Sequence, residues 1–198
     1  MRRLRRTALL ILSTLLMAAC VSVPTDRTTV LGSWKVDNYD KKFSDLLVIA
    51  LTDESGIRDK FEEIMVNRLG EAGLQAAASS SIMPIDKEIN RGTVKSAMAG
   101  KGMDGVLVAR LLNVERSAIY VPPSPDNTLT TSFSPIITTP GYVEHGSVIN
   151  LQFDLYDAAS EHVVWSLKSQ TVNLTDTTQV INALSDIIVA NLQSRGLI

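Results

Sequence analysis

The stretch DLLVIALTD, residues 45–53, decides the fold, because it is a continuous apolar run of strand length that ends in acidic residues. Its branched residues favour a strand, and a run without alternation predicts burial on both faces of a sheet. Apolar residues then recur three and four positions apart over 57–72, which predicts an amphipathic helix lying on that sheet. Gly73 follows as its C-terminal cap.

Working outward from this strand and helix, the rest of the chain gives the same two signals of strand and amphipathic helix. The further elements expected along the chain are a strand at 74–79, a helix at 93–100, a long strand at 103–121, an antiparallel hairpin at 148–172 turning near 158–161, and a helix over 180–192. Thr175 and Asp176 are the cap candidates for that last helix. The sequence therefore predicts the α/β (α+β) class, with a single mixed sheet, the order βαβα-β-(long loop)-ββ-α, and helices packed on the sheet.

Residues 122–146 contain five prolines and hardly any charge, which predicts a long exposed loop. Loops of this length are usually functional or disordered. Tyr120, Phe133 and Tyr142 flank this loop or lie within it, so they are the expected partner-binding residues.

The N-terminus has the anatomy of an export signal: four arginines, a short apolar run and then small residues. The apolar run is well short of the 20 or so residues that span a membrane. Met17-Ala18-Ala19-Cys20 resembles a bacterial lipobox, which implies cleavage before Cys20 and a lipid on its sulfur. An ordinary thiol behind a plain signal peptide is the alternative; Cys20 is the chain's one cysteine, so a disulfide within the chain is excluded.

These observations divide the chain into a signal peptide (1–19), a lipidated N-terminus and tether (20–44) and one α/β domain (45–198). Trp34 interrupts the polar tether, and we expect it to pack back on the domain in a short strand at 33–36. The residues after Cys20 are Val21 and Ser22 rather than Asp, and by resemblance to Gram-negative lipoprotein sorting this favours the outer membrane.

Charge excludes one class of function. Of 19 basic residues the signal peptide holds four, which leaves 15 against 21 acidic residues, or about six net negative charges. A nucleic-acid partner requires a basic surface, so none is expected.

The order of elements resembles the α/β domain of the curli secretion lipoprotein and the N-terminal domain of TolB. Three segments also resemble a group of uncharacterised bacterial lipoproteins: DLLVIALTD followed by R-x-x-F-E (Arg58, Phe61, Glu62), GKGMDGVLVARL at 100–111, and FDLYDAASEHVVWS at 153–166. This resemblance implies an envelope lipoprotein and no assigned activity. The curli lipoprotein forms a pore with hairpins, but the prolines of 122–146 would interrupt such strands, so a pore is disfavoured.

No motif in the sequence predicts catalysis. Metal-ligand spacings, a nucleophile elbow and phosphate-binding glycine loops are all absent. Asp53, Glu54 and Asp59 could be imagined as a cation site, but helix-start preferences explain them more simply. We therefore expect no enzyme activity, no cofactor and no metal.

The expected function is that of a non-enzymatic outer-membrane lipoprotein, held by Cys20 and facing the periplasm, whose domain is a binding or assembly module in the cell envelope. Its envelope protein partner is not identified by the sequence, and a homo-oligomer is allowed because strands near Val121 can present an open edge. The alternatives are a periplasmic small-ligand-binding domain that uses strand ends near Asp53 and Gly105, or a subunit of a secretion-type oligomer.

Overall fold

The computed structural model describes residues 27–83, 88–121, 124–125, 138–139, 141–172 and 176–198. They form a six-stranded sheet in the order β1-β8-β7-β4-β2-β3. The strands are β1 (Arg27–Lys35), β2 (Asp45–Leu51), β3 (Gln75–Ala78), β4 (Gly105–Val121), β7 (Tyr142–Asp157) and β8 (Val163–Val172). The pairs β2–β3 and β2–β4 are parallel and the others antiparallel, so the predicted mixed sheet and fold class are confirmed.

β2 lies inside the sheet, between β4 and β3, as its continuous apolar sequence predicts. Residues 46–50 are all buried, because alternate side chains point to opposite faces and both faces are covered here.

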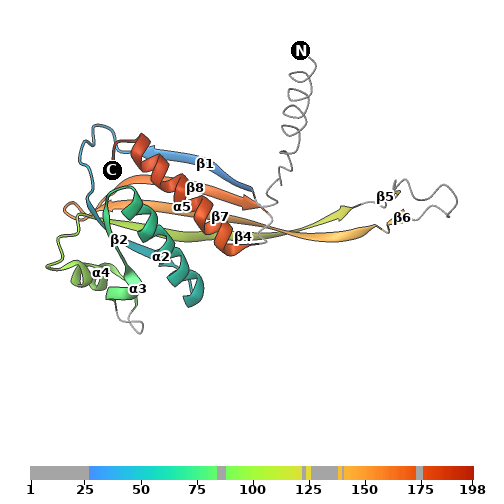
Figure 1. Ribbon diagram of the computed structural model, residues 1–198, viewed down its shortest axis with the longest axis horizontal. Coiled ribbons are helices and arrows are strands. Elements are labelled where there is room, and N and C mark those ends of the chain that lie inside the picture. Colours follow the sequence, from blue (N-terminus) through green and yellow to red (C-terminus); the bar gives the residue numbers. More distant parts are fainter. Residues whose placement is uncertain (1–26, 84–87, 122–123, 126–137, 140, 173–175) are drawn as a thin grey trace, which may run out of the picture.

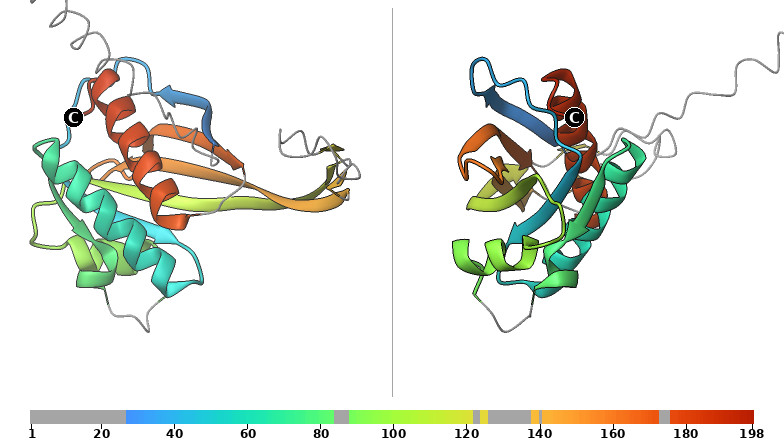
Figure 2. Two further views of the ribbon diagram at one scale, coloured as in Figure 1. Left: turned by 45° about the vertical axis from the view of Figure 1, so that its right-hand side comes forward. Right: turned by 90° about the vertical axis from the view of Figure 1, so that its left-hand side faces the viewer.

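Two long helices, α2 (Ser55–Glu71) and α5 (Thr177–Ser194), cover one face of the sheet (Figure 2). They lie side by side, joined by an ion pair of 2.9 Å between Arg68 and Asp186. At the start of α5, Asp176 accepts hydrogen bonds from the amides of Thr178 and Gln179, which confirms it as the cap. At the end of α2, Gly73 has a φ of +91°, and the amide of Leu74 bonds to the carbonyl of Leu69.

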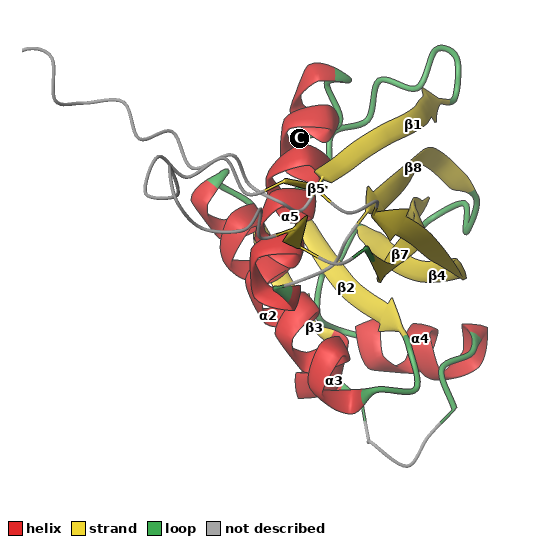
Figure 3. Ribbon diagram, turned by 90° about the vertical axis from the view of Figure 1, so that its right-hand side faces the viewer, coloured by secondary structure: helices red, strands yellow, loops and turns green. Residues whose placement is uncertain are grey.

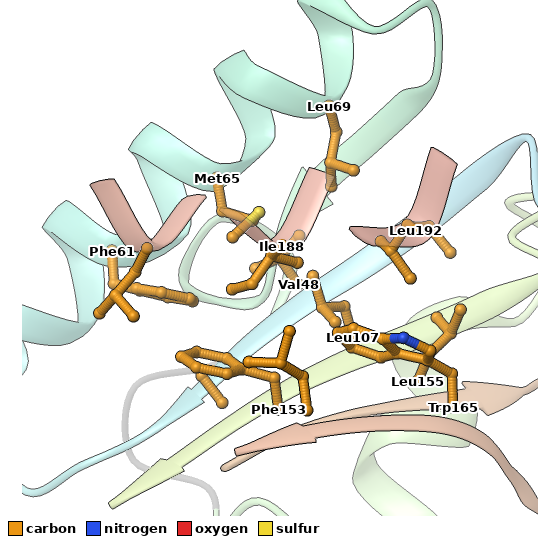
Figure 4. Packing of buried hydrophobic residues seen from close by; sticks show 14 of the residues in the cluster. Val48, Phe61, Met65, Leu69, Leu107, Phe153, Leu155, Trp165, Ile188 and Leu192 are labelled. Atoms are coloured by element: carbon orange, nitrogen blue, oxygen red, sulfur yellow. The ribbon is translucent and has the colours of Figure 1, made fainter. Parts of the chain in front are cut away.

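The main core lies between these helices and the sheet. Figure 4 shows apolar residues of the two helices above those of the sheet: Phe61, Met65 and Leu69 from α2, Ile188 and Leu192 from α5, and Val48, Leu107, Phe153, Leu155 and Trp165 from the strands. Trp165 is fully buried, and its indole nitrogen donates to Asn191 at 2.9 Å. Core packing is the usual role of a large apolar side chain on the buried face of a strand, and Trp165 follows it.

The opposite face of the sheet is covered much less. Figure 3 shows α4 (Arg91–Met98) on this side, and the short α3 (Ser79–Ile82) directly follows β3. Asn90 and Thr93 form a reciprocal capping box at the start of α4. Because α4 has eight residues, against 17 and 18 in α2 and α5, much of this sheet face has no helix over it.

β4 and β7 continue past the helices as a two-stranded ribbon that projects from the body of the domain (Figure 1). Their pairing reaches Val121 opposite Tyr142, and the small strands β5 (Ser124–Pro125) and β6 (Thr138–Thr139) pair with each other. The expected loop at 122–146 is therefore wrong at 124–125 and 138–139, which form β5 and β6, and at 142–146, which belong to β7. The prolines of 122–146 argued against strands in this segment. Pro125 nevertheless fits in β5, because this strand has only two residues and does not lie in the middle of a sheet.

The N-terminal strand is longer than expected. The sequence predicted a tether over 20–44 with a short strand at 33–36, whereas β1 begins at Arg27 and pairs with β8 along its length. Part of the expected tether is thus the edge strand of the sheet. Trp34 is in this strand, but its side chain is 49% exposed and does not pack into the core.

Candidate functional site

The sequence predicted four site residues, and the structure describes two of them. Cys20 and Phe133 lie outside the described residues, so lipidation and the role of Phe133 stay predictions. Tyr120 and Tyr142 lie on the ribbon, where Tyr120 pairs with Val143 and Tyr142 with Val121. They therefore occupy adjacent rungs of the ribbon.

Asp53 and Gly105 do not form a common site. β2 and β4 run parallel with Leu46 beside Gly105, so Gly105 lies at the start of β2 while Asp53 follows its end. The alternative of a ligand site joining these two positions is wrong in this respect. Within the described part of the chain no cluster of three or more His, Cys, Asp or Glu residues could hold a metal ion.

The R-x-x-F-E motif builds a buried polar cluster at the sheet edge. β3 pairs with β2 only as far as Val48, so the amide of Ala50 needs another partner, and the fully buried Glu62 carboxylate accepts it at 2.9 Å. Glu62 also accepts from the Ser79 hydroxyl at 2.6 Å and pairs with Arg58 at 3.2 Å. The motif therefore holds helix α2 to the strands, which is a structural role.

A second polar cluster joins the segment after β1 to the β7–β8 turn. Burial alone raises the pKa of Asp157, but hydrogen bonds from Lys41 Nζ at 2.8 Å, the Ala159 amide and the Tyr39 hydroxyl outweigh it and hold that pKa below its ordinary value. Burial and the bond to Asp157 raise the pKa of Tyr39. Both side chains are committed to internal bonds, so this cluster is also structural.

A cleft with a volume of about 600 Å³ lies between α4 and the sparsely covered sheet face. Its floor comes from β2, β4 and β7, and one wall is α4. The residues that line it are Ile49, Leu51, Ile89, Asn90, Arg91, Val94, Lys95, Met98, Ala99, Val106, Val108, Arg110, Tyr156, Asp157, Ala158 and Glu161. We call it the α4 cleft.

Charged side chains stand at both ends of the α4 cleft. At one end Arg91 and Lys95 share the carboxylate of Glu161, and the hydrogen bonds from Lys95 and Arg91 lower the pKa of Glu161. At the other end Arg110 pairs with Asp154 at 2.6 Å.

The composition of the α4 cleft indicates what it can do. Its lining includes no serine, threonine, cysteine or histidine, and its one hydroxyl, that of Tyr156, accepts a hydrogen bond from Arg110 at 3.1 Å. An apolar floor with charged ends suits the binding of an apolar group that carries neighbouring charges. The α4 cleft is therefore a candidate binding surface.

A second unpartnered surface lies along the outer edge of β1. Leu31 is 58% exposed, and Trp34 and Val36 are also exposed, followed by the exposed acids Asp37 and Asp40. We call these five residues the β1 surface. A hollow of about 380 Å³ adjoins it, lined by Leu31, Gly32, Ser33, Trp34, Ser166 and Lys168.

Sequence reasoning missed both surfaces. Because Trp34 was expected to pack on the domain, the sequence did not predict an exposed surface along β1. The helix at 93–100 was predicted, but no cleft beside it was. The shortness of the apolar pattern in 93–100 was the available signal, because an eight-residue helix is too short to cover a six-stranded sheet.

The described residues thus form a mixed-sheet α/β domain with two candidate binding surfaces. No protein-family model matches the chain, and no curated protein matches it. Among solved structures, the PelC dodecamer from Paraburkholderia phytofirmans is 14% identical over 84% of this chain and 98% of that chain, with a TM-score of 0.51. Lipoprotein GNA1162 from Neisseria meningitidis is 12% identical over 76% of this chain and 99% of that chain, with a TM-score of 0.45. The likeness to PelC shows a shared fold.

Among the helices of the described ranges, none is both long and apolar enough to cross a membrane.

Proposed function

We propose that the chain is a non-enzymatic lipoprotein of a Gram-negative outer membrane, anchored through Cys20, whose periplasmic domain assembles with copies of itself. The observation that carries this proposal is the β1 surface. An edge strand with exposed apolar side chains is a ready site for association, and monomeric proteins normally protect such edges.

The PelC likeness supports self-assembly. That solved structure is a dodecamer, and its subunit is matched over 98% of its length. A domain of this fold can therefore form an oligomer, and we propose that this chain does so too.

The β4–β7 ribbon supports a role in contacting a further envelope partner. It projects beyond the helices, and it brings Tyr120 and Tyr142 to adjacent rungs (Figure 1). We assign the partner contact to these two residues together with Phe133, because aromatic side chains are enriched in protein interfaces.

The test is the mass of the full chain. The protein purified from membranes in a mild detergent is measured by light scattering and native mass spectrometry, beside a Cys20→Ala variant. We expect an acylated chain that begins at Cys20 and an oligomer of defined size. A monomer across micromolar concentrations would refute self-assembly, and an unacylated wild-type chain would refute the anchor.

A further inference from the structure

The β1 surface and the α4 cleft lie on the same face of the sheet. Trp34 pairs with Ser166, which pairs with Asp154, which in turn pairs with Val108. Residues directly opposite one another in neighbouring strands point to the same face. Val108 lines the cleft, so the Trp34 side chain projects on the side where the cleft opens.

We propose that the β1 surface of one copy docks into the α4 cleft of a second copy. This inference rests on the proposed self-assembly and names the two surfaces that make it.

A chain cannot make this contact with itself. Trp34 lies three strands away from Val108, which at about 4.8 Å between strands is roughly 14 Å. The strands β8 and β7 lie between them within the same sheet, so the tryptophan of one copy cannot enter the cleft of that copy. Another molecule must supply it.

The apolar parts of the two surfaces match in kind. The cleft offers an apolar floor that includes Val106 and Val108 and an apolar wall that includes Met98. The β1 surface offers Leu31 and Trp34, both about half exposed or more. Tryptophan is enriched among the residues that carry most of the binding energy of protein interfaces, because it buries a large apolar area.

The charges are complementary as well. Asp37 and Asp40 are exposed and have no ion-pair partner among the described residues. Arg91 and Lys95 are 82% and 74% exposed, and they share the single carboxylate of Glu161, which leaves one positive charge in excess at that end of the cleft. Opposite charges at the rim of an apolar contact steer association and fix its register.

The position of both surfaces on one face allows two kinds of assembly. Two copies related by a two-fold axis would make the contact twice, whereas a head-to-tail repeat that closes would give a ring. In either case every copy uses its β1 surface and its α4 cleft once each.

A charge exchange tests the proposal. One variant carries Asp37→Lys and Asp40→Lys; the other carries Arg91→Glu, Lys95→Glu and Glu161→Lys, so that the ion pairs within the cleft rim are kept. Each variant alone now places like charges in the contact, and we expect each to lose the oligomer mass of the wild type. Mixed in equal amounts, the two variants restore opposite charges in every contact, and we expect the wild-type mass to return.

A crosslink gives a second readout that does not depend on charge. The full chain with Trp34→Cys and Met98→Cys, in native membranes under mild oxidation, is expected to form disulfide-linked multimers that a reducing agent dissolves. Ile57→Cys replaces Trp34→Cys in the matched control, because Ile57 is exposed on α2, away from both surfaces. The control should stay largely monomeric on the gel.

The outcomes separate the two proposals. An oligomer that ignores the charge exchange and gives no Trp34–Met98 crosslink would overturn the docking while self-assembly stands. A wild-type monomer would overturn both. In a further outcome, both variants lose the wild-type oligomer mass, mixing does not restore it, and no crosslink forms. This result would also overturn the docking, and it would leave the cleft to another occupant, such as a small apolar ligand.

Discussion

Replacing Glu62 by alanine should destabilise the domain strongly, because its carboxylate satisfies several donors at once. It accepts from the amide of Ala50 at 2.9 Å, the amide of Ser80 at 2.8 Å and the hydroxyl of Ser79 at 2.6 Å, and it pairs with Arg58 at 3.2 Å. A buried donor left without a partner costs about 1–3 kcal/mol. The hydroxyl can rotate, and the Arg58 side chain, 17% exposed, reaches some water. We therefore expect a loss of about 3–5 kcal/mol, the range for breaking a buried ion pair.

The assay is urea unfolding followed by the fluorescence of the buried Trp165, in a Trp34→Phe background that removes the second tryptophan. Glu63→Ala is the matched control, since Glu63 is the exposed neighbour on the same helix and should change the free energy of unfolding by less than about 0.5 kcal/mol. The double variant Arg58→Met with Glu62→Leu should recover part of the loss, because it removes the stranded charge. If Glu62→Ala fell within about 1 kcal/mol of Glu63→Ala, the role assigned to this cluster would be refuted.

Three further outcomes are expected. Gly105→Ala should lower the free energy of unfolding in urea by about 1–3 kcal/mol, because its new Cβ would lie 2.6 Å from the buried ring of Phe43. The control is Gly70→Ala, a helix position with open space around it, which should be neutral or stabilising. Equal effects of the two substitutions would contradict the argument. Asp157→Asn should lower the melting temperature at neutral pH, and the difference from wild type should disappear as the pH falls below about 4. The pKa of Asp157 is lowered in the folded state, so its carboxylate stabilises the fold at pH values above the ordinary pKa of 3.8 and loses that contribution as it is protonated. A difference in melting temperature that stays constant down to pH 2 would count against this role. Cys20→Ala should leave the chain either unprocessed or in the soluble fraction after cell lysis, and retention in the membrane pellet of a variant from which the signal peptide has been removed would exclude Cys20 as the main anchor.

The elements with strong internal patterns were predictable from the sequence. The continuous apolar run predicted β2, and the apolar stripes predicted α2 and α5. These predictions succeeded because burial on one or both faces of an element sets the spacing of its apolar residues. The edge strand β1 was predicted only at its end, as a short strand at 33–36, since its exposed residues leave no such signal over 27–32. The first strand of the ribbon was predicted to its end at Val121, but the start of β7 at 142–146 was missed, because the proline content and low charge of 122–146 resemble a loop.

Relations between elements were harder to predict than the elements themselves. The sequence placed Asp53 and Gly105 near strand ends but could not say that they lie at opposite ends, because that depends on strand direction and register. The α4 cleft is likewise a matter of coverage: it exists because one short helix faces a wide sheet. Arg91, Lys95 and Met98 carry no motif, and their importance appears only once α4 is set against the β7–β8 turn.

The pairing of β1 with β8 sets an order on the folding of this chain. Arg27 lies opposite Val172, so the strand that is synthesised first is joined to one that is synthesised near the end. Contacts this distant along the chain form late, because closing so long a loop costs entropy before the contact repays it. A nascent chain must therefore keep its first strand unpaired, and its exposed apolar residues unprotected, until nearly all of its length has emerged. Truncation before Val163 would leave β1 without a partner and make β7 the new open edge of the sheet.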